Sequence, residues 1–355
     1  MSEFFKRHWF LTMLAALIAA GLTLGLRGWG PAVKPWAARL NPQATIAAIL
    51  LLMAYTLDTQ RIRAAFRAPG PVCCGFAVNF GFVPLAGWLL MGVQQSADFR
   101  LGLMIAAAVP STTAAASVIT RKARGNDAVS LLVTLSTNIL CFVMTPLWLS
   151  LAASQRVEFD LGRMIVDLLK SALVPTVLGQ LLRQPARLHH FADRHKLSIS
   201  VVAQVLIELM VFTAALDAGT KLRDMQTGLP PTQTAAIDHA NVGVASDAGP
   251  QVTLAAVGIA WTSCVGLHVA ALAVGWLMAR GLKFSRADSI PVAFSGSQKT
   301  LPTGLLVASM FAAEHPFAMF PMLLYHASQL FIDTLLAERW AGSSRDATSA
   351  PPFPK

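Results

Sequence analysis

Charged residues are scarce in this chain. Only 13% of its 355 residues are Asp, Glu, Lys or Arg, against about a quarter in soluble globular domains. Hydrophobic residues make up 55% of the sequence, and the mean hydropathy is +0.56. This scarcity excludes an ordinary soluble domain. Because apolar runs recur along nearly the whole chain, residues 1–340 are predicted to form one integral membrane domain.

Cysteines are also few, and the usual catalytic arrangements of residues are missing from the sequence. The four cysteines all fall inside apolar runs, where they are expected as small buried hydrophobic residues, and no spacing among them resembles a metal site. The sequence shows no paired catalytic carboxylates, no His/Asp metal cluster and no Ser/His/Asp arrangement. It also lacks the GxxxxGK[ST] motif of ATP-driven proteins. These absences argue against an enzyme and against ATP-driven transport by this chain alone.

Basic residues are numerous but dispersed. The net charge is +10, yet Lys and Arg lie in short loops, whereas a nucleic-acid binder gathers them on one face. With the N-terminus placed inside, 18 of the 28 basic residues fall in inner segments, eight in outer segments and two within spans. This asymmetry predicts both termini on the cytoplasmic side of the cell (inner) membrane. The lipid bilayer is therefore an expected partner, and nucleic acid is not.

Ten segments are apolar enough to be membrane spans, although the second is short. They lie at about 8–26, 43–57, 71–93, 100–120, 127–152, 161–182, 197–216, 251–279, 287–312 and 317–338. The predicted fold is an all-α integral membrane protein with ten transmembrane helices. Residues 217–250, rich in Gly, Pro, Thr and Asp, are predicted to be an external loop, and residues 341–355 a flexible polar tail.

Two predicted spans are interrupted by polar residues. The fourth contains Pro110 followed by three hydroxyl residues, and the ninth contains Gly296, Pro302 and Gly304 around Lys299. A proline removes a backbone donor, and in lipid the freed groups need internal partners or a cavity. Two such interruptions in corresponding places indicate the binding site of a secondary transporter. For a single proline, a simple kink is the alternative.

The interruptions also suggest an internal repeat. Spans 3 to 5 and spans 8 to 10 form two triplets, each with its broken span in the middle. The triplets start five spans apart, which is an odd number, so they would be inverted relative to each other. This inference rests on the order of the spans, because the two triplets share no evident pattern of residues.

Two stretches of sequence resemble a known family. The run PSTTAAASVITRKARGNDAVSLLVTLSTNILCFVMTPLWL resembles the bile acid:sodium symporter superfamily. The run SGSQKTLPTGLLVASMF, followed by FPMLLYHASQLFI, is similar more particularly to the SBF-like branch, which includes the divergent seventh member of the vertebrate bile-acid solute carriers. The resemblance covers residues 5–340 except the external loop.

The resemblance implies a fold and an activity. It implies a core domain of spans 3–5 and 8–10, at about 71–152 and 251–338, in which spans 4 and 9 cross as broken helices. Spans 1, 2, 6 and 7 would form a panel domain. The implied activity is alternating-access symport of a small organic anion with sodium. Sodium ions are therefore possible bound ions, and no other cofactor is expected.

The resemblance also points to ion-binding positions. In this sequence they fall on Asn79, Ser117, Ser130, Thr134, Ser295, Ser297 and Gln298. At two further positions the chain departs from the family pattern, because Ala116 lacks a hydroxyl and Phe294 replaces a carboxylate. Sodium prefers several oxygen ligands, including negative charge, by the same logic as calcium. Coupling to two sodium ions is therefore in question.

Lys299 lies near the middle of the ninth span and needs an explanation. Its ammonium could extend along the helix to the membrane surface, could bond the carbonyls freed by the broken helices, or could act at their crossing. At the crossing it could replace a sodium ion, meet an anionic substrate or carry a proton. Thr112, Thr113, Thr300 and His326 are further candidates for contact with a substrate or coupling ion.

Other polar residues within spans are expected to pair internally. They are Glu208, His268, Gln329 and Asp333. Three other functions stay open beside sodium symport: a proton-coupled or uncoupled carrier with Lys299 in place of a sodium ion, an ion channel, and a membrane sensor that binds a ligand without moving it. The sequence does not identify the substrate.

Overall fold

The computed structural model describes residues 3–37, 41–57, 69–152, 161–227, 253–312 and 314–346, and within these ranges all regular structure is helical. The helices before the first break are α1 (Glu3–Leu26), α2 (Gly30–Ala37), α3 (Pro42–Tyr55), α5 (Pro69–Ala77), η1 (Val78–Phe82), α6 (Val83–Leu90) and η2 (Met91–Val93). Then come α7 (Ala97–Ala108), α8 (Thr113–Lys122), α9 (Asp127–Ala152), α10 (Leu161–Leu168), η3 (Leu169–Leu173), α11 (Val174–Leu182) and α12 (Ala186–Arg194). The last are α13 (Lys196–Thr227), α14 (Leu254–Gly281), α15 (Arg286–Ser297), α16 (Leu301–Met310) and α17 (Met319–Asp346).

The helices coincide with the apolar runs of the sequence. Among the described residues, five helical segments are long and apolar enough to cross a membrane: Pro69–Val93, Asp127–Ala152, Leu161–Leu182, Lys196–Asp224 and Leu254–Gly281. Two shorter apolar helices, Thr12–Leu26 and Pro42–Tyr55, cover the first two runs. The protein is thus all-helical in its described part, with the composition of a membrane protein.

Two boundaries differ from the sequence prediction. Helix α13 continues to Thr227, so its last turns occupy the start of the segment predicted as an external loop. The extension has packing partners, because the Lys221 ammonium donates to the Ala312 carbonyl (3.2 Å) and Gly219 lies directly against Leu22 of α1. Helix α17 likewise continues to Asp346, into the predicted tail. Residues 228–250 and 347–355 lie outside the described residues.

One cysteine also differs from the sequence prediction that all four are buried. Cys73 is exposed on α5, whereas the other three cysteines are buried.

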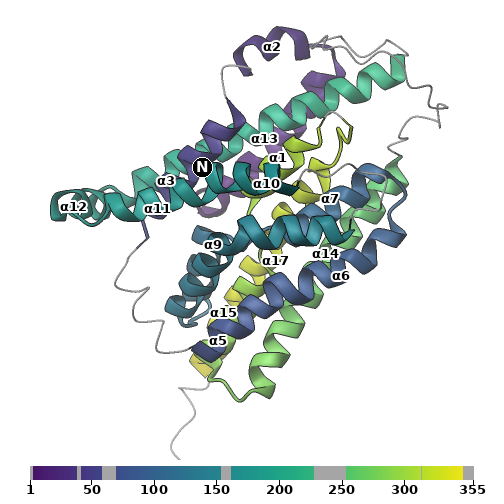
Figure 1. Ribbon diagram of the computed structural model, residues 1–355. Coiled ribbons are helices and arrows are strands. Elements are labelled where there is room, and N and C mark those ends of the chain that lie inside the picture. The colour runs from purple at the N-terminus through teal and green to yellow at the C-terminus, as the bar shows by residue number, and fades with distance from the viewer. Residues whose placement is uncertain are drawn as a thin grey trace, which may run out of the picture.

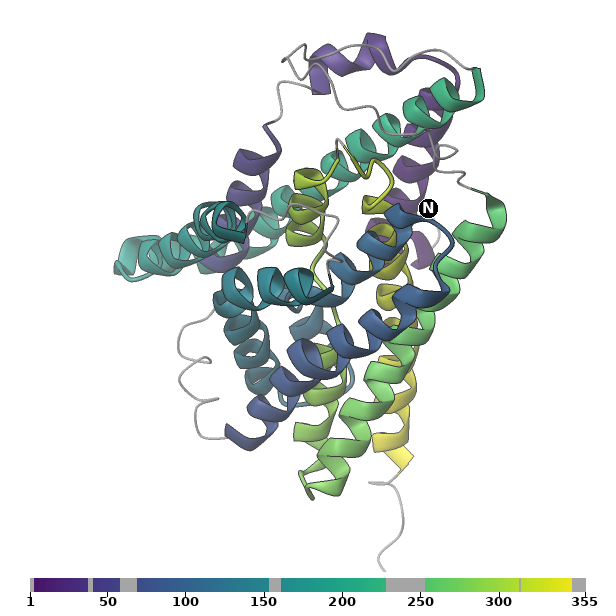
Figure 2. The ribbon, with the colours of Figure 1, turned by 45° about the vertical axis from the view of Figure 1, so that its right-hand side comes forward.

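The helices pack in two groups. In Figure 1, α3, α11, α12 and α13 lie in the upper part of the molecule, and α5, α6, α14 and α15 lie below them. Helix α1 packs along α13, and α3 packs against α11 and α13. In the other group α14 packs against both α15 and α17, as Figure 2 shows from a second side. The groups meet where α10 and η3 contact α9 and where α3 contacts α16.

Two pairs of helices are each separated by a short interruption. Four residues separate α7 from α8, and three residues separate α15 from α16. Val109 has an extended backbone (φ −76°, ψ 159°), and so has Gln298 (φ −71°, ψ 147°). The largest hydrophobic cluster surrounds these interruptions, with Leu103, Leu306 and Met322 fully or almost fully buried. The fold therefore places two stretches of non-helical backbone inside its largest cluster of buried hydrophobic residues.

Candidate functional site

The break between α15 and α16 exposes carbonyl groups that side chains from other helices satisfy. The Asn79 side-chain amide donates to the carbonyls of Ser295 (3.3 Å), Gly296 (3.1 Å) and Gln298 (3.0 Å). The Tyr325 hydroxyl donates to the Ser297 carbonyl (2.8 Å). Because a helix end leaves its last carbonyls without partners, Asn79 and Tyr325 allow α15 to end inside the protein.

Helix α9 does the same for the break between α7 and α8. The Thr145 hydroxyl donates to the Ala108 carbonyl (2.8 Å), and the Asn138 amide donates to the Ser111 carbonyl (2.9 Å). The Ser111 backbone N–H donates to the Thr137 hydroxyl (3.3 Å). Three polar residues of α9, namely Thr137, Asn138 and Thr145, thus provide partners for the backbone of the first interruption.

The two breaks are joined directly. The Thr300 backbone N–H donates to the Pro110 carbonyl (2.9 Å), and the Thr112 hydroxyl donates to the Gln298 side-chain carbonyl (3.1 Å). The Thr112 oxygen also accepts from the Ala116 N–H at the start of α8. These contacts bring together segments almost 190 residues apart in the sequence, so both interruptions belong to one site.

Lys299 lies at this junction and is fully buried. Its ammonium donates to the backbone carbonyls of Asn79 (2.7 Å) and Val109 (2.9 Å), and its nitrogen is 3.3 Å from the Asn79 side-chain oxygen. It also lies 5.6 Å from the centroid of the Phe80 ring, within cation–π distance. An ammonium has three N–H donors, and here three oxygens surround it. Lys299 therefore does not extend to the membrane surface, and it links both interrupted helices to the third span.

A local π-helical turn explains why the Asn79 carbonyl is available. In η1 the Val83 N–H donates to the Val78 carbonyl, five residues back, instead of to Asn79. Pro84 follows and has no N–H, so the Phe80 carbonyl loses its donor and accepts from the Trp148 indole instead (2.7 Å). Such π-turns are frequent at functional sites.

The backbone of Lys299 is also fixed. Its N–H donates to the Gln329 side-chain oxygen (2.8 Å), and the Gln329 amide nitrogen donates back to the Lys299 carbonyl (2.8 Å). The same amide nitrogen lies 2.8 Å from His326 Nδ1. Helix α17 thus recognises the extended backbone with one glutamine, and it brings the predicted residue His326 next to the break.

A buried carboxylate completes the site. The Gln298 amide donates to Asp333 (2.6 Å), and His268 Nε2 lies 2.9 Å from the other oxygen of the same carboxylate. All three side chains are fully buried. Asp333 and His268 were expected only to pair internally, and they do pair. The contact to Gln298 was not predicted, because it depends on how α14 and α17 are rotated about their axes.

The predicted ion positions are brought together only in part. The hydroxyls of Ser130 and Ser295 lie 2.8 Å apart, whereas Thr134 donates to the Leu131 carbonyl of its own helix (2.9 Å). Ser297 likewise donates to its own helix, at the Phe294 carbonyl (3.2 Å). The neutral oxygens of Ser130 and Ser295 therefore face each other without a carboxylate between them.

The remaining predicted positions make fewer contacts. Ser117, Ala116 and Thr300 are buried near the breaks, and the side chain of Thr113 lies outside the described ones. Phe294 is fully buried, with its ring centroid 5.1 Å from that of Trp340. An aromatic contact thus stands where the family resemblance predicts a carboxylate.

Hydroxyl groups without a partner mark where a ligand could bind. Among the described residues, the buried oxygens of Ser111 and Thr303 form no hydrogen bond within the protein. Ser111 lies in the first break and Thr303 in the first turn of α16. Since buried polar groups are normally hydrogen-bonded, these two hydroxyls are available to a small polar molecule or an ion. The sequence pointed to Ser111 only as one of the three hydroxyl residues after Pro110, and it did not point to Thr303.

Comparison with known proteins assigns this architecture to a family. The sequence profile of the SBF-like CPA transporter family matches residues 8–229 and 240–342. The chain belongs to the SBF-like CPA transporter family. This membership confirms the predicted resemblance, and it makes the protein a membrane transporter rather than an enzyme. The matched segments contain nearly all of the helices that are drawn in Figure 1.

Curated relatives of this SBF-like transporter carry related names. "Probable sodium/metabolite cotransporter BASS4, chloroplastic" of Arabidopsis thaliana is 25% identical over 315 residues, which are 85% of this chain and 66% of the relative. BASS1 of the same plant, with the same description, is 24% identical over 92% of this chain and 73% of its own length. An uncharacterised protein of Pseudomonas aeruginosa is 27% identical over 78% and 76%. The chain thus spans two thirds to three quarters of these relatives.

Proposed function

We propose that this transporter is a ten-span secondary active carrier of a small organic anion, driven by sodium symport through alternating access. The observation that carries the proposal is the junction of the two broken helices, where Thr300 bonds Pro110 and Thr112 bonds Gln298. Interrupted helices that meet deep inside a membrane protein are the usual place of substrate and coupling-ion sites. The spans that carry them, 3–5 and 8–10, would form an inverted repeat and a core domain, and spans 1, 2, 6 and 7 a panel domain.

The helix ends at the junction favour an anionic substrate. Helices α8 and α16 both begin there, at Thr113 and Leu301. A helix N-terminus presents N–H groups and partial positive charge. Helix α16 has no side-chain cap at Thr300, and the unpaired Thr303 hydroxyl lies in its first turn. Together these groups suit a carboxylate or a similar small anion.

The oxygens at the junction suit fewer sodium ions than the two that the family pattern implies. The Lys299 ammonium lies among oxygens of Asn79 and Val109, which is the kind of surrounding that a bound cation would need. A second position, between Ser130 and Ser295, retains neutral oxygens. We therefore propose symport with a single sodium ion at the Ser130/Ser295 position, while Lys299 acts as a tethered replacement for the other.

The proposal is tested by flux in proteoliposomes. Purified protein is reconstituted and uptake of a panel of radiolabelled organic anions is measured with an inward sodium gradient, with potassium in place of sodium, and with a proton gradient. At least one anion should accumulate only with sodium, and Ser130→Ala should weaken the sodium dependence. Uptake driven equally by protons or by no gradient would favour the carrier without sodium. Ligand binding without flux would indicate a sensor, and sodium current without uptake would indicate a channel.

A further inference from the structure

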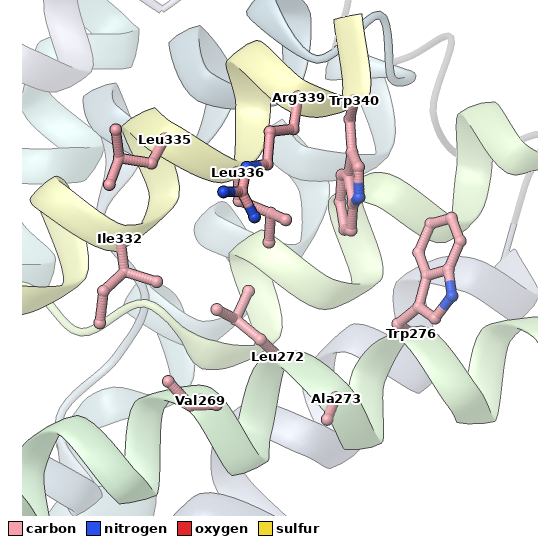
Figure 3. Close-up of a pocket in the computed structure, with 9 residues that line it drawn as sticks. All are labelled: Val269, Leu272, Ala273, Trp276, Ile332, Leu335, Leu336, Arg339 and Trp340. Atoms are coloured by element: carbon pink, nitrogen blue, oxygen red, sulfur yellow. The ribbon is translucent and has the colours of Figure 1, made fainter. Parts of the chain in front are cut away.

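An apolar groove lies outside the site described above, between α14 and α17. It has a volume of about 450 Å³, within the range of about 300–1,000 Å³ found for small-ligand sites. Figure 3 shows Val269, Leu272 and Ala273 on α14 facing Ile332 and Leu335 on α17. Several of these side chains are exposed, Val269 by 46% and Leu335 by 48%. In a membrane protein such an exposed apolar surface faces lipid chains.

One cation, Arg339, is among the residues that line this groove, and its sequence neighbour Trp340 lies at one end of it. The guanidinium of Arg339 extends from α17 over the groove in Figure 3. Arg339 forms no hydrogen bond or ion pair with the residues that the structure describes. Nearby, Lys122 pairs with Glu338 (2.9 Å), and Arg286 donates to the Trp340 carbonyl (2.7 Å). These neighbouring cations have partners within the protein, whereas Arg339 is available to an anion.

Two tryptophans mark the depth of this end in the membrane. The rings of Trp276 and Trp340 lie 4.7 Å apart at the end of the groove. Tryptophan is enriched at the boundary between hydrocarbon and headgroups, and the end of α14 and the end of α17 are both predicted to be cytoplasmic. Arg339 thus lies at the level of the phosphates, in the leaflet that carries anionic lipid.

We propose that this groove binds an anionic phospholipid, with its phosphate on Arg339 and an acyl chain along α14 and α17. An arginine pairs well with phosphate through its planar donors, and the apolar walls bury the chain. A soluble substrate is a poorer fit, because the fully buried Phe294 packs on Trp340 and separates the groove from the broken helices. This proposal depends on membrane insertion and not on the transported substrate.

The test measures the melting temperature of the purified full chain in detergent. Phosphatidylglycerol, phosphatidylcholine with identical chains and water-soluble glycerol 1-phosphate are added separately. We expect phosphatidylglycerol to raise the melting temperature by several degrees, phosphatidylcholine to raise it much less, and glycerol 1-phosphate to have no effect. Native mass spectrometry of the same samples should show one retained phosphatidylglycerol.

Three variants locate the effect. Arg339→Gln removes the cation, and Ala273→Trp fills the groove from an exposed position, so both should lose the phosphatidylglycerol shift and the retained lipid. Arg280→Gln is the matched control, because Arg280 is exposed at the same end of α14 but does not line the groove; it should keep both. Equal shifts with both lipids, a full shift in Arg339→Gln and Ala273→Trp, or an equal shift with glycerol 1-phosphate alone would each overturn the proposal. The lipid-free melting temperature of each variant separates loss of binding from loss of folding.

Discussion

At the scale of single residues, Lys299 shows how a charge is accommodated inside a membrane protein. A lysine at the centre of a spanning helix costs about 3 kcal/mol on insertion scales. Here the ammonium is surrounded by oxygens of Asn79 and Val109, which are available because of a π-turn and a proline break. The lysine and the irregular backbone therefore stabilise each other.

Replacing Lys299 should create a need for another cation. In Lys299→Ser the carbonyls of Asn79 and Val109 lose their donor, so the melting temperature should fall. Sodium should then raise it more strongly than in the unchanged protein, because the ion can occupy the vacated oxygens. Thermal unfolding in sodium and in choline buffers checks this. Lys170→Ser is the control, because Lys170 is exposed in the sixth span. If sodium affects both variants equally, Lys299 does not stand in for an ion.

Asp333 is expected to position Gln298 rather than to bind substrate. Asp333→Leu removes the acceptor for both Gln298 and His268. Two buried donors without partners should cost about 2–6 kcal/mol in free energy of unfolding, and Asp333→Asn should cost less because its amide oxygen still accepts. A double-mutant cycle with Gln298→Leu should show strong coupling by denaturant titration, and additive effects would contradict the contact.

The sequence predicted the location of the site better than its bonding. Pro110, Gly296 and Pro302 indicated where both breaks lie, because each stands beside polar residues inside an otherwise apolar span. The partners of those breaks could not be predicted. Asn79 and Gln329 contact the second break only because η1 and α17 present particular faces to it. Helix rotation leaves little trace in an apolar sequence, so such pairings need the three-dimensional structure.

At the scale of helices, glycines determine how closely α1 and α13 approach. A Cβ atom added to Gly25 would lie 2.5 Å from the Leu216 carbonyl oxygen, and one added to Gly219 would lie 2.4 Å from the Leu22 carbonyl oxygen. Gly21 and Gly25 form the small-xxx-small spacing that allows membrane helices to pack backbone against backbone. The apolar composition identified α1, but it did not reveal this partner.

Enlarging Gly25 should separate these two helices. Gly25→Val is expected to lower the free energy of unfolding by about 1–3 kcal/mol, because the contacted atoms belong to rigid backbone. Gly258→Val is the matched control, since a Cβ there meets nothing within 4 Å, and it should change stability much less. Chemical denaturation of both variants in mild detergent measures the difference, and equal effects would show that the close contact is unimportant.

The short helix α12 should give a defined pH dependence. Arg183, which also donates to the Tyr55 carbonyl (3.1 Å), bonds Asp193, and this hydrogen bond lowers the pKa of Asp193 below its ordinary value of 3.8. A lowered pKa means that the interaction stabilises the fold fully above about pH 4 and is lost as the pH falls through the lower, folded-state pKa. The Asp193 side chain is 48% exposed, so the effect is small.

Asp193→Asn should therefore have a slightly lower melting temperature than the unchanged protein at pH 6, and the gap should narrow as the pH falls below about 4. Melting curves between pH 3 and 7 check this, with Asp167→Asn as the control carboxylate. A gap that does not narrow at all between pH 5 and pH 3 would mean that Asp193 acts through something other than its charge.

At the scale of the whole molecule, the orientation in the membrane is the prediction most open to a direct test. The basic residues place the N-terminus and C-terminus in the cytoplasm. A fluorescent protein fused to the C-terminus or after Gly125 should fluoresce, because it folds in the cytoplasm. Alkaline phosphatase fused after Thr227 should be active, because that end of α13 is predicted to be outside. The opposite pattern would invert the orientation and with it the leaflet that contacts Arg339.

Composition alone anticipated an all-helical membrane protein, and the described helices agree with it. The grouping of those helices was implied by the family resemblance and not by composition. Among the described residues, five helical segments are both long enough and apolar enough to span a membrane. Each helix of an interrupted pair, such as α15 and α16, is too short to span it alone. Broken spans are thus the elements that the hydropathy of single helices detects least well, although they carry the proposed site.

The opposite charges at the junction have an electrical consequence. Lys299 and Asp333 both belong to the helix group that contains α14 and α17, and both are buried among them. A unit charge moved through the membrane potential changes the free energy by about 2.3 kcal/mol per 100 mV. Carried as an ammonium and a carboxylate, these two residues cancel each other, so together they would displace no net charge if the helices that carry them moved across the membrane. The resting voltage of the cell would then exert no net bias through this pair of residues, and it would act on the ion and substrate that the carrier holds.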